Sequence, residues 1–148
     1  MTSPPLIIGL GSPHGDDQAG WLVIARLRAL GLPASQAVPA RTPADLWDWC
    51  RSDRALTVCD ACVDVGPPGT LKRWVWPEHC LPSTCGGTHD LSLGVVLSLG
   101  RELGSFPANV VVWTITGASF APNAAASEVV LSACEHLAGR LTEALRVN

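Results

Sequence analysis

The chain has 148 residues, of which 47% are hydrophobic, and a formal net charge of −3. This composition excludes a disordered chain and a strongly basic nucleic-acid-binding protein, and the length predicts one domain over residues 1–148. The N-terminus has no basic start, and its apolar run at 6–10 is too short for a signal peptide or a membrane span. We therefore expect a cytoplasmic protein that binds neither nucleic acid nor membrane and keeps its six cysteines reduced.

The hydrophobic pattern predicts strands and helices that alternate along the chain. In chain order, the expected strands cover residues 6–10, 35–39, 55–60, 70–76 and 109–116. The expected helices cover residues 18–30, 43–52, 89–103 and 124–146. Thr42 is the expected N-cap of the second helix, and Pro43 is its first residue.

The character of the strands predicts how they are arranged. Most of them are nearly continuous apolar runs, which is typical of strands that are buried on both faces. The strand at 70–76 alternates instead and is expected at an edge or in an antiparallel position. The expected fold class is α/β with three layers: a twisted, mostly parallel mixed sheet of about five strands with helices on both faces.

Polar side chains follow several of these strands where the strands end. Asp16 and Asp17 come after the first strand, Asp60 ends a later one, and His89 and Asp90 begin a helix. In sheets of this kind, ligands collect at the carboxyl ends of the strands. Carboxylates together with an imidazole suit a divalent metal ion or general acid–base chemistry, so the sequence predicts a site at this edge.

Each of these residues also has a simpler structural interpretation. Asp16 or Asp17 could cap the helix that follows, although one cap requires only one of them. Asp60 could merely begin the turn after its strand, and His89 could be an exposed residue in the first turn of a helix.

Gly9 and Gly11, after the first strand, resemble the start of a dinucleotide-binding fingerprint, which holds a pyrophosphate at a helix N-terminus. His14 takes the place of the third glycine, and the carboxylates of Asp16 and Asp17 would repel a phosphate. We therefore expect these glycines to serve a tight turn, and we expect no nucleotide cofactor.

The spacing of four cysteines superficially resembles a zinc site with four thiolate ligands. These residues are Cys59, Cys62, Cys80 and Cys85. Because Cys59 and Cys62 end a strand, alternation should point at least one of them into the core, and we predict no stoichiometric zinc. A thiolate mechanism using Cys62 or Cys85, with His89 as the base, is a further option that only sequence proximity supports.

Three motifs resemble those of the hydrogenase maturation proteases, in the same order. GLGSPHGDDQAG is similar to the family's G-[IVL]-G-N loop that leads to D-[DE]-x-x-G. VCDACVDVGPPGTL is similar to its strand-end V-D-A with a P-G-[TD]-[ILV] turn, and THDLSL is similar to its [ST]-H-x-[LI] segment. The resemblance covers residues 6–140.

The resemblance implies an endopeptidase that removes the C-terminal extension of a nickel-iron hydrogenase large-subunit precursor after nickel insertion. It implies a twisted mixed sheet, and it makes Asp17, Asp60 and His89 the catalytic and metal-interacting residues. The nickel would be supplied by the precursor, and Asp16 would be a helix cap or a partner of the site. The alternative is a non-catalytic metal-binding or precursor-docking module of hydrogenase maturation. The expected partner is the precursor, and we expect a monomer.

The chain departs from the family pattern in several places. Ser12 stands where the family usually has asparagine. The segment 117–122 reads GASFAP where the family tends to carry G-x-[EQ]-P beside the cleft, so this departure concerns the choice of substrate.

Overall fold

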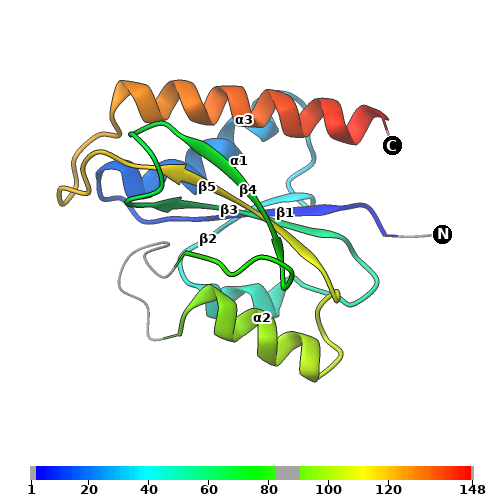
Figure 1. Ribbon diagram of the computed structural model, residues 1–148. Coiled ribbons are helices and arrows are strands. Elements are labelled where there is room, and N and C mark those ends of the chain that lie inside the picture. The colour runs from blue at the N-terminus through cyan, green and yellow to red at the C-terminus, as the bar shows by residue number, and fades with distance from the viewer. Residues whose placement is uncertain (1–2, 83–90, 148) are drawn as a thin grey trace.

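A computed structural model of the protein describes residues 3–82 and 91–147. Figure 1 shows a twisted sheet between two layers of helices. In spatial order, the strands are β2 (Ala37–Ala40), β1 (Leu6–Leu10), β3 (Leu56–Cys62), β5 (Val110–Thr116) and β4 (Leu71–Trp76). The helices are α1 (Ala19–Ala29), α2 (Leu93–Glu102) and α3 (Glu128–Val147), with 3₁₀ helices η1 (Gly15–Gln18) and η2 (Pro43–Asp48).

The strand directions confirm the expected fold class. The β1–β2, β1–β3 and β3–β5 pairs are parallel, and β4 runs antiparallel to β5 at one edge. The alternating pattern at 70–76 therefore corresponds to an edge strand, as predicted. Among the residues that the structure describes, no helix is long and apolar enough to cross a membrane.

Two apolar cores lie on opposite faces of the sheet. Helices α1 and α3 cover one face, where Ile7, Cys59 and Ile115 are buried, and α2 covers the other, where Ile8 and Val58 are buried. Consecutive strand residues thus enter different cores, which explains why the central strands are apolar at nearly every position. Burial of each large aliphatic side chain contributes about 1.5–3 kcal/mol to stability.

The N-terminus of α1 lies unusually close to the sheet. A Cβ atom on Gly20 would come within 2.1 Å of the Leu10 carbonyl oxygen and 2.7 Å of the Cys59 carbonyl oxygen. Only glycine permits this approach, because any side chain would clash with backbone atoms of both strands. As a result η1, which precedes α1, lies against β3.

Several helix boundaries differ from those expected. The helix expected at 18–30 is preceded by the 3₁₀ turn η1, and the stretch expected at 43–52 is a 3₁₀ helix that ends at Asp48. Thr42 does cap η2, in a capping box with Asp45. A segment of only six residues can form this tighter helix without the longer run of packing contacts that stabilises an α-helix.

The other two helices begin later than expected. Helix α2 starts at Leu93, because the Ser92 hydroxyl accepts a hydrogen bond from the Val95 N–H at 3.2 Å. The start predicted at His89 and Asp90 lies outside the described residues. Helix α3 starts at Glu128 rather than at 124, because the residues before it form a loop that a distant carboxylate holds.

Candidate active site

Asp17 lies in η1, directly after the loop that leaves β1. Its side chain is 7% exposed, and its Oδ2 accepts a hydrogen bond from the Ser12 hydroxyl. Its Oδ1 is buried and has no hydrogen-bond partner among the described residues. A buried carboxylate oxygen without a donor is costly, so it indicates a place where a cation or a water molecule would be stabilising.

Asp60 lies near the carboxyl end of β3 and is 2% exposed. It follows Val58 by two positions, so alternation places it on the face of the sheet that α2 covers. On the neighbouring strand, Thr114 is its partner in the parallel register. An aspartate that merely began a turn would be exposed to solvent, whereas Asp60 is buried between neighbouring strands.

The close approach of α1 to the sheet brings the two acidic segments together. Because η1 lies against β3, the segment that carries Asp17 is next to the strand that carries Asp60. His89, the third predicted residue, lies outside the described residues. Within residues 3–82 and 91–147, no three His, Cys, Asp or Glu side chains form a group that could hold a metal ion.

Asp16 has a different role from its neighbour. Its Oδ2 accepts hydrogen bonds from the backbone N–H groups of Ala118 at 2.7 Å and Ser119 at 3.1 Å. Its Oδ1 accepts from the Ser127 N–H at 2.7 Å, and the Ser127 hydroxyl lies 2.9 Å from each oxygen. Neither Asp16 nor Asp17 caps the helix that follows, so that interpretation is wrong: the cap positions are His14 and Gln18, without side-chain cap bonds.

The pKa of Asp16 reflects this hydrogen bonding. Burial alone would raise it, because a charged carboxylate loses its hydration. The backbone N–H groups of Ser127, Ala118 and Ser119, together with the Ser127 hydroxyl, stabilise the charged form and lower the pKa below its ordinary value. Asp16 is therefore a carboxylate held in its ionised form by the loop after β5.

Further contacts join the loop after β1 to residues 123–124, which directly follow the segment 117–122. Gly15 N–H donates to the Ala124 carbonyl at 3.0 Å, and Gln18 Nε2 donates to the same oxygen at 2.9 Å. Asn123 N–H donates to His14 Nδ1 at 3.0 Å. These contacts were not predicted from the sequence, where the only signal for them was the unusual pair of adjacent aspartates.

The cysteines of β3 point to different sides of the sheet. Cys59 packs in the core beneath α1 and α3, where burial raises the pKa of its thiol. Cys62 is three positions further on, and its Sγ lies 3.6 Å from Thr116 Oγ1. In a regular strand, residues three apart face opposite sides, a geometry that disfavours one zinc ion bound by both sulfurs. Cys80 is exposed, and Cys85 lies outside the described residues.

Comparison with known proteins gives one consistent result. No family model matches the chain. A hydrogenase maturating endopeptidase, HybD from E. coli, superposes with a TM-score of 0.77 at 20% identity, over 97% of this chain and 93% of that one. The NiFe hydrogenase maturation protease HycI from Thermococcus kodakarensis gives a TM-score of 0.73 at 23% identity, over 98% and 94% of the two chains. A hydrogenase 2 maturation peptidase from a Thaumarchaeota archaeon gives 0.68 at 24% identity, over 99% and 100%. The chain therefore has the fold of the hydrogenase maturation proteases over nearly its whole length.

Proposed function

We propose that the protein is an endopeptidase that removes the C-terminal extension of a nickel-iron hydrogenase large-subunit precursor after nickel insertion. The observation that carries this proposal is the buried Oδ1 of Asp17, which has no described hydrogen-bond partner and belongs to a segment packed against the strand of Asp60. The fold shared with maturation proteases and the three sequence motifs support it further.

The chemistry of the two carboxylates suits this reaction. An ionised carboxylate that is removed from water needs a compensating charge or donor, and a divalent ion or a bound water molecule would provide one. Asp17 and Asp60 would supply oxygen ligands, and His89 is the proposed third ligand, with a nitrogen that suits nickel. We treat the nickel as part of the precursor, so the protease would recognise a substrate that already carries its metal.

The residues of the chain would then act on the peptide bond in one of two ways. The carboxylates can hold a water molecule and accept its proton as it attacks the scissile carbonyl. They can also fix the position of the precursor's metal ion beside that bond, where the ion would supply Lewis acidity. Both descriptions assign the same residues and predict the same losses on substitution.

The decisive experiment uses the large-subunit precursor from the same genome in nickel-loaded and nickel-free forms. Each form is incubated with the protein, and the mass of the large subunit is measured. We expect loss of one C-terminal peptide from the nickel-loaded form only, and no loss with the Asp60→Asn variant. Stable binding of the precursor without a change in mass would favour a docking module, and the absence of both would contradict the proposed function.

A further inference from the structure

The two edges of the sheet differ in how their backbone groups are used. At the β2 edge, the Ala37 carbonyl accepts from Arg28 Nε at 2.9 Å, and the Arg41 N–H donates to Asp45 Oδ2 at 3.0 Å. Pro39, between them, has no N–H to offer. This edge is therefore closed to pairing with another strand.

The β4 edge is open along part of its length. In an antiparallel pair, alternate residues direct both backbone groups toward the partner strand. The Thr70 carbonyl accepts from Thr116 N–H, which places Lys72 and Trp74 in the positions that bond to β5. The backbone groups of Leu71, Arg73 and Val75 therefore point away from β5.

Only one of these three outward positions is satisfied. The Val75 N–H donates to His79 Nδ1 at 2.8 Å, and the Val75 carbonyl accepts from the His79 N–H at 2.7 Å. No hydrogen bond to the outward groups of Leu71 or Arg73 occurs among the described residues. The stretch from Leu71 to Arg73 thus presents two N–H donors and two carbonyl acceptors to an incoming strand.

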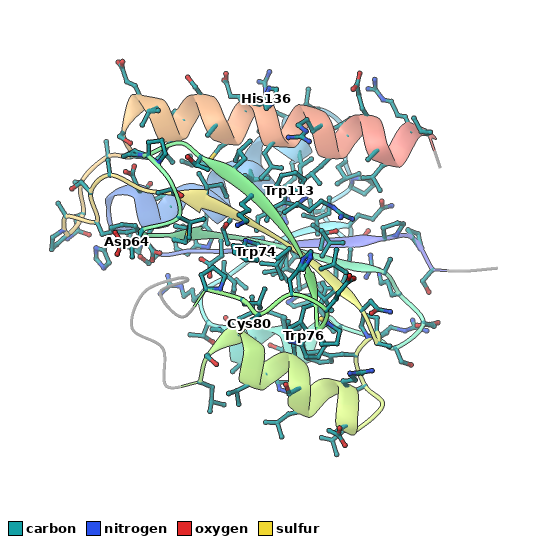
Figure 2. All side chains as sticks on the ribbon, in the orientation of Figure 1. Asp64, Trp74, Trp76, Cys80, Trp113 and His136 are labelled. Atoms are coloured by element: carbon teal, nitrogen blue, oxygen red, sulfur yellow. The ribbon has the colours of Figure 1, made fainter. Side chains whose placement is uncertain are left out.

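The side chains along this stretch are positively charged on both faces of the sheet. Lys72, the only lysine of the sequence, is exposed, and its Nζ lies 4.3 Å from the centre of the Trp74 ring. Arg73, also exposed, is on the opposite face, in register with Trp113. Figure 2 shows Trp74 and Trp113 on the two sides of the sheet. Among the described residues the one ion pair within 4 Å lies elsewhere, so neither cation has a carboxylate partner there.

Building on the proposed function, we propose that the edge of β4 at Leu71–Arg73 binds an extended segment of the precursor that carries two adjacent acidic residues. The segment adds a strand to the sheet, with main-chain hydrogen bonds to Leu71 and Arg73. Because successive side chains of a strand alternate between faces, one acidic residue meets Lys72 and the next meets Arg73.

The position of this edge relative to Asp60 fits a single bound peptide. Lys72 is in register with Thr114, and Thr114 is in register with Asp60. Three strand spacings of about 4.8 Å place the added strand roughly 14 Å from Asp60, a span that about four or five extended residues cover. One precursor segment can therefore pair with β4 and still reach the candidate active site.

Amide hydrogen exchange, followed by NMR, tests the main-chain pairing. The Asp60→Asn protein is mixed with the nickel-loaded precursor, so that no cleavage interferes. We expect slower exchange at the Leu71 and Arg73 amides. The Lys72, Trp74 and Val75 amides are already bonded and serve as internal controls. If exchange at the Leu71 and Arg73 amides already slowed in the free protein, and slowed further as the protein concentration was raised, a second copy of the chain would be the occupant. That result would overturn the proposal.

Recognition of acidic residues by Lys72 and Arg73 is tested by kinetics and crosslinking, both with a protein that keeps Asp60. Reversal of both charges, Lys72→Glu with Arg73→Glu, should raise KM roughly tenfold and leave kcat unchanged. The single charge reversal Arg26→Glu, on exposed α1 surface away from β4, serves as a control and should change neither KM nor kcat. A carbodiimide should join the Lys72 amine to an acidic residue of the precursor. Lys72→Arg should abolish that crosslink and keep KM near its original value.

The outcomes separate this inference from the proposed function. The proposed binding at the β4 edge alone would be overturned if three results occurred together: the double reversal cleaved the precursor with an unchanged KM, Lys72 formed no crosslink, and the precursor did not change amide exchange at Leu71 and Arg73. Failure of the protein both to bind and to cleave the precursor would overturn both.

Discussion

The carboxylate of Asp16 binds Ser127, the residue before α3, across 111 positions of sequence: the Ser127 N–H donates to Oδ1 at 2.7 Å, and the hydroxyl lies 2.9 Å from both oxygens. Together with the Ala118 and Ser119 amides, this contact fixes the loop between β5 and α3 against η1. Asp16 therefore holds η1, the segment that carries Asp17, against this loop.

We expect the Asp16→Asn variant to lose on the order of 3 kcal/mol of unfolding free energy, because an amide nitrogen would face N–H donors that need an acceptor. This exceeds the value of a single helix cap, which is about 1 kcal/mol. Urea unfolding at neutral pH measures the difference. Asp48→Asn, at an exposed position, is the matched control, and an equal loss in the two variants would contradict the assignment.

The stabilisation by Asp16 should also depend on pH. Its pKa is lowered in the folded protein by hydrogen bonds from Ser127, Ala118 and Ser119, while an unfolded aspartate titrates near 3.9, as model peptides do. The contribution is therefore fully present above about pH 4 and is lost as pH falls through the folded pKa. The free-energy gap between wild type and Asp16→Asn should be constant from pH 7 to about 5 and shrink at lower pH.

Substitution at the candidate active site should separate activity from stability. Asp17→Asn, Asp60→Asn and His89→Ala should each lower precursor cleavage by roughly 10²-fold or more, since each removes a group proposed to act on the substrate. Asp17→Asn should leave the unfolding free energy unchanged or raise it, because it removes a buried charge whose Oδ1 has no described partner. Cleavage assays and urea unfolding on the same preparations test this, and a large loss of stability in Asp17→Asn would contradict it.

The close contact between α1 and the sheet gives a matched pair of glycine substitutions. Gly20→Ala places a methyl group 2.1 Å from the Leu10 carbonyl oxygen, so it should cost about 1–3 kcal/mol or more and lower activity by moving η1 away from β3. Gly139→Ala, in α3 with no atom within 4 Å of its Cβ position, should stabilise by roughly 0.5–1 kcal/mol. Thermal unfolding of both variants provides the measurement, and similar shifts in the same direction would refute the argument.

The sequence by itself determined the α/β class. The strands predicted at 55–60 and 109–116 are largely apolar, which indicates cover on both faces, while the segment 70–76 alternates as an edge strand does. The capping of η2 by Thr42 was equally local, because a capping box joins residues only three positions apart. Asp17 and Asp60 could be named as candidates because each follows or ends an apolar strand, and their assignment as site residues stays a prediction.

Only the tertiary structure decided which hydrogen-bond partners each of the neighbouring aspartates has. Sequence patterns report on residues within a few positions of each other, and by that criterion either Asp16 or Asp17 could cap the helix that follows. Folding brings the loop after β5 to Asp16 and supplies it with donors, while one oxygen of Asp17 is left buried without a described partner. The same applies to the open edge of β4, because strand order and register depend on contacts between distant segments, and local propensity carries no information about them.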